Sequence, residues 1–183
     1  MMNIPAELEI LFNKYYSDNP KLLATVLIHS ECVARKAIEC IIKKNLPVDK
    51  NFIYKAALLH DIGVVKCNAP DIYCVGEKPY ICHGIEGAII LHENGFEQFA
   101  PFCERHTGSG LTKEEIQSRN LPLPHKDMIP LTLEEKIICY ADKFYSKSGD
   151  LRREKTFNEI IAQLSKHGET VVERILELHN FFN

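Results

Sequence analysis

The segment Leu58-Leu59-His60-Asp61-Ile62-Gly63 constrains the fold most, because an apolar helical run leads directly into an adjacent imidazole and carboxylate. A charged group at the end of a buried helix needs a partner, since an unpaired buried charge costs several kcal/mol even after its surroundings relax. Neighbouring His and Asp side chains that converge in a dry site usually share a divalent metal ion. Taken alone, the pair also fits a capped helix end with a hydrogen-bonded core histidine.

Helical periodicity dominates the 183 residues, and no convincing pair of alternating strands is present. We therefore expect an all-α fold, a helical bundle that forms one domain over residues 1–183. Within it we expect a metal-site core at about 22–147 and a C-terminal helical extension at about 151–183. The expected helices cover residues 5–16, the stretch after Pro20, 51–62, the stretch from His83, 97–105, the stretch from Thr112, 132–147, and 156–182 with an interruption at Gly168.

Residues 64–82 lose the helical periodicity and are rich in turn-forming residues, so we expect a long loop there after Gly63 ends the third helix. Loops of this length in a compact domain often act as lids or binding loops. Lys66 and Lys78 lie in this loop, and either could reach an anion.

The charge balance excludes several partners. The chain has 22 Lys and Arg against 25 Asp and Glu, for a formal net charge of -3, so it lacks the electrostatic footprint of a protein that binds a nucleic-acid duplex. No apolar run approaches the roughly 20 residues that a membrane-spanning helix needs, and the N-terminal stretch carries acids where a signal peptide would carry bases. We expect a cytoplasmic protein without a membrane partner.

The seven cysteines are odd in number and include no C-x-x-C spacing, which argues against a disulfide scaffold. Cys67, Cys74 and Cys82 share the loop, but their wide spacing favours free thiols over a zinc site.

Four further potential ligands lie where helices should face the core. His29 occupies a position at which the apolar pattern of its helix requires a buried hydrophobe. Asp142 is a carboxylate in the apolar stripe of the helix expected over 132–147, and a buried acid needs a cation or hydrogen-bond donors. His83 opens a helix, and His106 enters a turn. Each also has a simple alternative, either a packed core histidine or an aspartate turned toward water.

Gly84 and Gly87 lie one turn apart in the helix that His83 opens. That helix face lacks side-chain bulk, so a neighbouring helix or a bound group can approach closely. The remaining histidines occupy surface, loop or packing contexts and receive no role: His92, His125, His167 and His179.

The order H…HD…H…H…D, with His60-Asp61-Ile62-Gly63 in it, resembles the HD-domain superfamily of metal-dependent phosphohydrolases, and more closely its HDIG subgroup. The likeness spans residues 27–145. Three further stretches are similar to a small, uncharacterised HDIG family common in archaea, namely residues 104–112, Leu121-Pro122-Leu123-Pro124, and residues 132–143.

The resemblance implies a set of metal ligands. It assigns the first metal to His29, His60, Asp61 and Asp142. In two-metal members the aspartate at the Asp61 position bridges both ions, and the histidines at the positions of His83 and His106 complete the second site. The expected cofactor is thus one or two divalent transition metals per chain, and the ligand chemistry favours Fe, Mn, Ni, Co or Zn over a thiolate-rich site.

One departure from the family pattern bears on the substrate. The two-metal cyclic-dinucleotide phosphodiesterases of the superfamily carry paired histidines where this chain has Arg105-His106. Other two-metal HD hydrolases, including those that cleave dinucleoside polyphosphates, use a single histidine there. The resemblance therefore favours a second metal without favouring cyclic-dinucleotide cleavage.

The expected activity is that of a phosphohydrolase or phosphodiesterase on a small phosphorylated substrate, such as a nucleotide. Asp61 would act at the metals, and Lys66, Arg105 and Lys143, the cations nearest to the ligands in sequence, would neutralise charge on phosphoryl oxygens. Each cation could instead be a surface residue or a partner for a nearby glutamate.

Two other functions fit the same ligands. One is a di-iron oxygenase on an HD scaffold, and the other is a non-catalytic metal-binding sensor or scaffold. A homodimer is also possible, since the C-terminal segment 171–182 ends in Phe181-Phe182 and could pack against a second copy.

Overall fold

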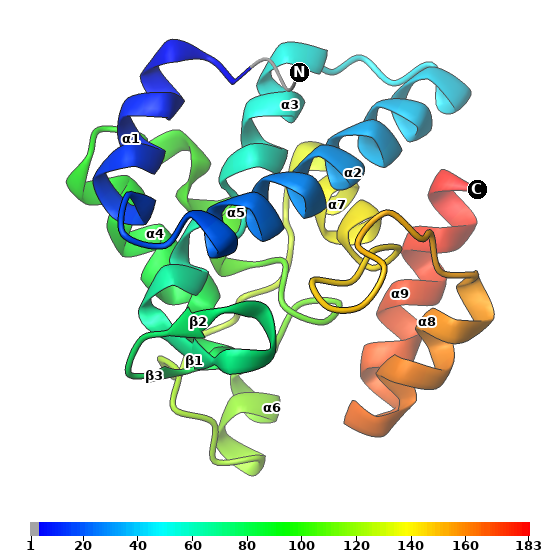
Figure 1. The fold of residues 1–183 in the computed structure, drawn as a ribbon. Helices are drawn as coiled ribbons and strands as arrows, with labels where there is room; N and C mark the ends of the chain where they lie inside the picture. The colour runs from blue at the N-terminus through cyan, green and yellow to red at the C-terminus, as the bar shows by residue number, and fades with distance from the viewer. Residues whose placement is uncertain (1–3) are drawn as a thin grey trace.

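The computed structural model describes residues 4–183, so the first three residues of the predicted domain lie outside it. The prediction of an all-α fold is confirmed, because helices make up most of the described chain (Figure 1). The α-helices are α1 (Ala6–Tyr16), α2 (Pro20–Lys44), α3 (Lys50–Leu59), α4 (His83–Glu93), α5 (Ala100–Glu104), α6 (Lys113–Ser118), α7 (Leu133–Asp142), α8 (Phe157–Leu164) and α9 (Glu169–Phe182).

Local signals in the sequence explain where the longest helix begins and ends. The side chain of Asn19 caps α2 by accepting a hydrogen bond from the Leu22 amide at 3.1 Å, and Pro20 occupies the first turn, where its missing N–H costs nothing. At the other end Asn45 adopts a left-handed conformation with φ 48°, a common way to end a helix.

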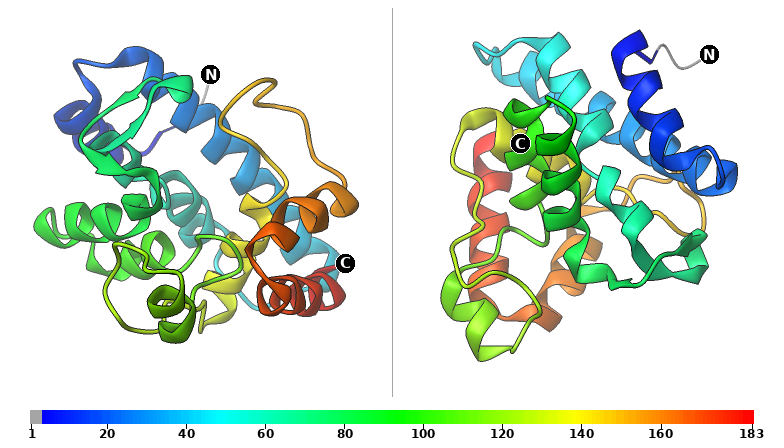
Figure 2. Two further views of the ribbon diagram at one scale, coloured as in Figure 1. Left: turned by 90° about the horizontal axis from the view of Figure 1, so that it is seen from below. Right: turned by 90° about the vertical axis from the view of Figure 1, so that its left-hand side faces the viewer.

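A large apolar core joins most of the helices, and a second, smaller apolar cluster surrounds Ile116 of α6. α2 runs through the middle of the molecule and packs against α3 and α7, while α4 packs against α5 (Figures 1 and 2). Tyr16, the last residue of α1, is buried, and its hydroxyl donates to the Ile62 carbonyl at 2.8 Å, next to the His60-Asp61 pair.

The stretch 64–82, predicted as one long loop, contains regular structure that the sequence did not reveal. This stretch contains a small three-stranded sheet in the order β2-β1-β3, with β1 (Cys67–Ala69) antiparallel to β2 (Cys74–Val75) and parallel to β3 (Lys78–Pro79). The strands are too short to produce an alternating pattern that a sequence could reveal.

The sequence predicted that Gly63 ends the third helix, and this prediction is wrong. The α-helix stops at Leu59, and a 3₁₀ helix, η1 (Ile62–Lys66), continues through Gly63. A Cβ at Gly63 would lie 2.1 Å from the His83 carbonyl oxygen and 2.2 Å from the Gly87 amide nitrogen. The glycine therefore permits the close contact between η1 and α4, and Gly87 takes part in the bulk-free face predicted for α4.

The helix that carries Asp142 is shorter than the predicted 132–147. Thr132 caps α7 by accepting a hydrogen bond from the Glu135 amide at 3.2 Å. The two residues do not form a reciprocal capping box, because the Glu135 carboxylate accepts from the Leu131 amide at 2.8 Å and pairs with Arg105. Asp142 is the last residue of α7.

The C-terminal extension is a helical pair, as predicted, with its interruption at Gly168, where φ is 122°. α8 and α9 lie side by side at one side of the molecule, and the small sheet lies at the other (Figures 1 and 2). All seven cysteines are free thiols, as predicted. Among the described residues, no helix combines the length and the apolar character that crossing a membrane requires.

Candidate metal centre

The six predicted ligands come together from five places in the chain. All six side chains are buried, with relative exposures between 0% and 8%. They lie in the middle of α2 (His29), directly after α3 (His60 and Asp61), at the start of α4 (His83), just after α5 (His106) and at the end of α7 (Asp142).

Four of these residues form a first group. His29 Nε2 lies 3.2 Å from Asp61 Oδ2 and 2.9 Å from Asp142 Oδ1. His60 Nε2 lies 3.0 Å from the same Asp61 oxygen and 3.5 Å from the same Asp142 oxygen. Two ligands of one ion with bonds of about 2.1 Å lie about 3 to 3.5 Å apart. The group could therefore hold one ion.

Asp61 also belongs to a second group. Its other oxygen, Oδ1, lies 3.6 Å from His83 Nε2 and 3.4 Å from His106 Nε2. One carboxylate thus faces one pair of imidazoles with each oxygen. That arrangement is the one a carboxylate needs to bridge two ions.

Backbone carbonyls orient three of the imidazole rings. His60 Nδ1 lies 2.6 Å from the Ala57 oxygen, His83 Nδ1 lies 2.7 Å from the Tyr80 oxygen, and His106 Nδ1 lies 2.8 Å from the oxygen of Cys103, three residues earlier. A carbonyl accepts only, so each Nδ1 carries a proton, and in the neutral form of each ring Nε2 presents a lone pair.

The lone pairs then face one another. His83 Nε2 and His106 Nε2 are 3.0 Å apart, and two unprotonated nitrogens at this distance repel unless a cation lies beside them. Carbonyl partners of this kind are also what orients histidines that ligate metals.

Buried atoms without hydrogen bonds gather at the same place. His60 Nε2 and Asp61 Oδ1 have no hydrogen-bond partner, although roughly 90% of buried polar groups in proteins have one. The atoms that could ligate a metal here are imidazole nitrogens and carboxylate oxygens, with no thiolate. This set suits divalent ions of borderline hardness. The buried cluster therefore fits a divalent metal ion.

The charge states of Asp61 and His83 agree with that fit. Burial alone would lower the pKa of His60, but Asp61 and Asp142 raise this pKa to about 9, so an ion would bind this ring by displacing a proton. Burial lowers the pKa of His83 to about 3, so its ring is neutral at pH 7. Burial raises the pKa of Asp61, but His60 and Lys147 outweigh this effect and hold it well below its usual value. A neutral imidazole and an ionised carboxylate are the forms that bind metals.

Comparison with known proteins identifies the scaffold. The model of the HD domain family matches residues 26–147, which include all six residues. The chain belongs to the HD domain family. An uncharacterised protein of Methanocaldococcus jannaschii is 35% identical over 162 residues, which are 86% of this chain and 88% of that protein.

Two further relatives are longer proteins. A tRNA (cytidine(56)-2'-O)-methyltransferase of Picrophilus torridus is 39% identical over 115 residues, or 62% of this chain. A protein of the same name from Thermoplasma volcanium is 31% identical over 150 residues, or 81% of this chain. This HD domain spans only 28% and 39% of their respective lengths. No solved structure matches the chain.

Of the cations predicted to act in this HD domain, Lys143 lies at the centre. Its Nζ is 2.6 Å from Asp142 Oδ2 and donates to the His106 carbonyl at 2.8 Å. The ammonium is therefore held beside one predicted ligand by the backbone of another.

The other two predicted cations lie elsewhere. Lys66 is exposed, with Nζ 5.6 Å from the centre of the Tyr15 ring. Arg105 binds Glu135 through both carboxylate oxygens, at 3.1 and 3.0 Å. Neither residue lines the pocket beside the centre, because η1 turns Lys66 toward solvent and a buried glutamate holds Arg105.

Lys147 is a cation of the centre that the sequence did not reveal. Its Nζ lies 2.6 Å from Asp61 Oδ2 and 4.0 Å from Asp142 Oδ1. Because α7 ends at Asp142, the chain turns back there, and the Tyr145 amide donates to the Asp142 carbonyl at 3.2 Å. The longer helix that the sequence predicted would have carried Lys147 away, so its nearness to Asp142 in the chain was the one available signal.

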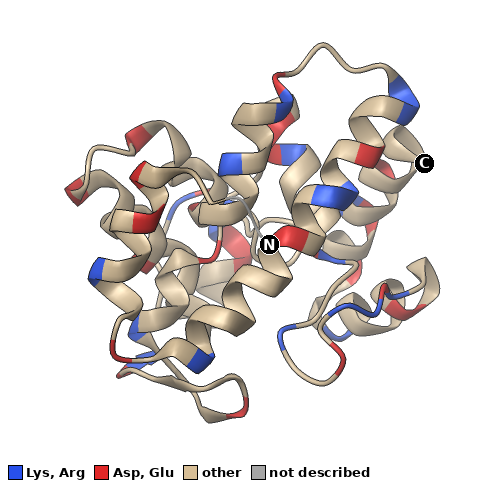
Figure 3. Cartoon of the chain, turned by 45° about the horizontal axis from the view of Figure 1, so that its top comes forward, with Lys and Arg blue, Asp and Glu red and all other residues tan. Residues whose placement is uncertain are grey.

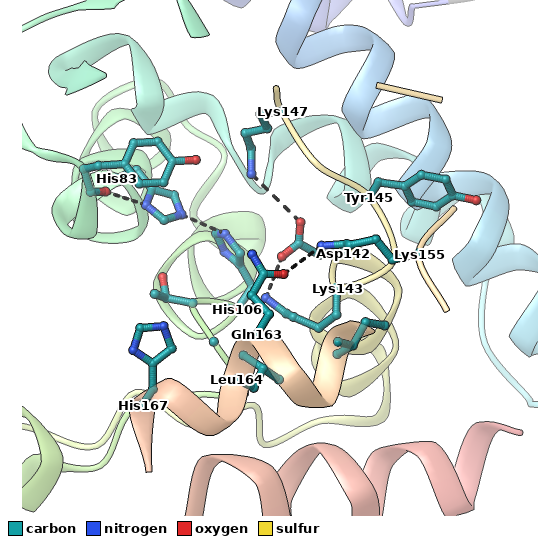
Figure 4. A pocket seen from close by; sticks show the side chains of 14 residues that line it. His83, His106, Asp142, Lys143, Tyr145, Lys147, Lys155, Gln163, Leu164 and His167 are labelled. Atoms are coloured by element: carbon teal, nitrogen blue, oxygen red, sulfur yellow. Dashed lines mark hydrogen bonds and ion pairs between the residues drawn. The ribbon is translucent and has the colours of Figure 1, made fainter. Parts of the chain in front are cut away.

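The centre opens into a pocket of about 280 Å³. His83, His106 and Asp142 lie on one side of it (Figure 4). Tyr80 lines it too and stacks on the His83 ring with 4.8 Å between ring centres. Other lining residues were not predicted to act at the site. Thr107 and Gly108 follow His106, and the rest come from the segment after α7, from α8 and from η5 (Ser165–His167): Tyr145, Lys155, Ile160, Gln163, Leu164 and His167.

Proposed function

We propose that this HD domain is a metal-dependent phosphohydrolase of the HDIG subgroup that acts on a small phosphorylated substrate. The observation that carries the proposal is the position of Asp61, whose two oxygens face two separate pairs of imidazoles beside an open pocket. HD domains are typically metal-dependent phosphohydrolases, and His60-Asp61-Ile62-Gly63 supports the subgroup.

The chemistry that a pair of divalent ions supplies when bound is a nucleophile derived from water at neutral pH and charge stabilisation at phosphoryl oxygens. The protein contributes orientation and charge. His60, His83 and His106 are fixed in one tautomer by backbone carbonyls. Lys143 and Lys147 point their ammonium groups at the centre, where they can bind phosphoryl oxygens and offset the negative charge that grows on them.

A nucleotide is the substrate class that we favour. Relatives with the same domain are named tRNA methyltransferases, which links the domain to proteins that handle nucleotides. A whole RNA fits less well, since Lys and Arg are interspersed with Asp and Glu along the chain (Figure 3) and the net charge is -3. The seven free thiols are consistent with action in the cytoplasm.

The test is hydrolysis of nucleotides and dinucleoside polyphosphates by protein loaded with Mn, Fe or Co, followed through the phosphate released from nucleotides and the nucleotides released from dinucleoside polyphosphates. We expect Asp61→Asn to reduce turnover by about 100-fold or more, because the variant loses the carboxylate shared by both groups. The exposed Asp18→Asn serves as the control and should keep full activity.

Two results would contradict the hydrolase. Equal turnover in the wild type and Asp61→Asn would show that the release does not depend on the centre. Two irons per chain, with oxygen consumption and no phosphate release, would favour the di-iron oxygenase instead.

A further inference from the structure

Lys155 differs from the other lysines of the pocket in its partner. Lys143 and Lys147 each lie 2.6 Å from a carboxylate oxygen. The side chain of Lys155 instead donates to Gln163 Oε1 at 3.2 Å, and the described residues provide it with no carboxylate ion pair. Its positive charge is therefore left without a counter-charge in contact.

The surroundings of Lys155 make that charge costly. The residue is partly buried. Burial lowers the pKa of its ammonium, Asp142 partly offsets this effect, and the positive charges of Lys143 and Lys147 lower the pKa further. A partly desolvated ammonium gains most from an anion that can contact it. Because Gln163 uses its oxygen to hold Lys155, its amide NH₂ group remains as a further donor toward the same place.

The position of Lys155 in the pocket indicates that this anion is part of the substrate bound at the metal centre. A second cavity of about 310 Å³ adjoins the pocket of the centre, and both are lined by Lys147, Lys155 and Gln163. Figure 4 shows Lys155 and Gln163 facing the same space as Lys143 and Asp142. A phosphate bound at Lys155 would therefore lie next to a phosphate bound at the metal centre.

The two residues also lie outside the segment that matches the family. The HD domain match ends at residue 147, whereas Lys155 precedes α8 and Gln163 lies in it. The C-terminal extension therefore adds a wall to the pocket that the family core does not supply.

We propose that Lys155 and Gln163 form a second anion subsite, which binds a phosphate group next to the one that the metal centre cleaves. This proposal rests on the proposed function. It narrows the substrate class to compounds with two or more linked phosphates, such as nucleoside polyphosphates, and disfavours monophosphates. The segment from Lys155 through α8 then contributes to substrate specificity.

The experiment compares the binding of ADP and AMP to the full chain by calorimetry after chelator treatment, so that the result does not depend on turnover. Wild-type protein should bind ADP about 10-fold more tightly than AMP, because the second phosphate gains a charge-assisted hydrogen bond. In Lys155→Gln this preference should fall to about 2-fold or less, while AMP affinity changes little. Lys136→Gln, which removes an exposed charge on α7, should keep the full preference.

The outcomes distinguish failure of the anion subsite from failure of the proposed hydrolase function. An equal preference in the wild type and Lys155→Gln would overturn the subsite, as would a wild type that binds both nucleotides equally or not at all. An ADP preference that depends on Lys155, in a protein that releases no phosphate with any metal, would support the subsite and refute the hydrolase.

Discussion

Lys143 and Arg105 are both cations next to predicted ligands in the sequence, yet they have different partners. Lys143 is held against Asp142 and the His106 carbonyl, at the mouth of the candidate centre. Arg105 is turned toward Glu135, whose side chain is only 5% exposed. Adjacency in sequence therefore could not tell a charge that meets the substrate from one that neutralises a buried glutamate.

The Arg105–Glu135 pair predicts a loss of stability and not of chemistry. Arg105→Met should lower the free energy of unfolding by about 2 kcal/mol, because it leaves a buried carboxylate without its cation while the 25% exposure of the arginine lessens the effect. Urea denaturation measures this, and phosphate release per folded molecule should stay within about twofold.

Lys126→Met is the matched control. Its ion pair with Glu104 is more exposed, with the lysine 54% accessible, so the variant should lose less than about 1 kcal/mol. A large fall in turnover for Arg105→Met at unchanged stability would restore the catalytic role that the sequence suggested.

The sequence was most informative where a polar residue interrupted an apolar stripe. His29 and Asp142 stood out in this way, and the structure places both in the first group. Lys147, Lys155 and Gln163 did not stand out, because they occupy polar segments and reach the pocket only through the chain reversal after α7 and the packing of α8. Such contacts are tertiary and leave no periodic signal.

At the level of elements, the contact between η1 and α4 positions both halves of the centre. Asp61 precedes η1 and His83 begins α4, so the separation of these elements sets the distance between them. That separation depends on Gly63, where even a methyl group would overlap the backbone of α4. The sequence pointed to Gly63 as a helix terminator, because a glycine after a helix usually has that role.

Gly63→Ala tests the importance of this contact. A Cβ 2.1 Å from the His83 carbonyl oxygen cannot be accommodated without moving α4, so we expect a loss of about 3 kcal/mol or more in unfolding free energy. Thermal and urea denaturation would measure it.

Gly149→Ala provides the comparison, because its Cβ would meet nothing within 4 Å and only its positive φ of 71° opposes the change. It should cost about 1 to 2 kcal/mol. A Gly63→Ala variant as stable as Gly149→Ala would mean that η1 and α4 can separate freely. The separation of these elements would then not depend on Gly63.

Elements were predictable where their signals were local. The Thr112 and Thr156 capping boxes start α6 and α8 where the sequence placed helices. The sheet inside 64–82 and the early end of α7 were not predictable, because short strands and a shortened helix depend on what packs against them.

At the scale of the whole molecule, the centre joins segments that are far apart in the chain. α2, the end of α3, the start of α4, the end of α5 and the end of α7 each contribute a ligand group within one buried cluster. Two ions there, one in each ligand group, would together link all of these segments, and their binding energy would add to the stability of the fold. α8 and η5 contribute pocket residues but no ligand.

The most direct test of the account is the metal content of protein purified without a chelator or a metal-binding tag. We predict close to two divalent ions per chain, falling to about one in His83→Ala and in His106→Ala, because each variant removes a ligand from the group on Asp61 Oδ1. His92→Ala, at an exposed position of α4, should leave the content unchanged. A single ion that neither His83→Ala nor His106→Ala affects would contradict the two-ion centre.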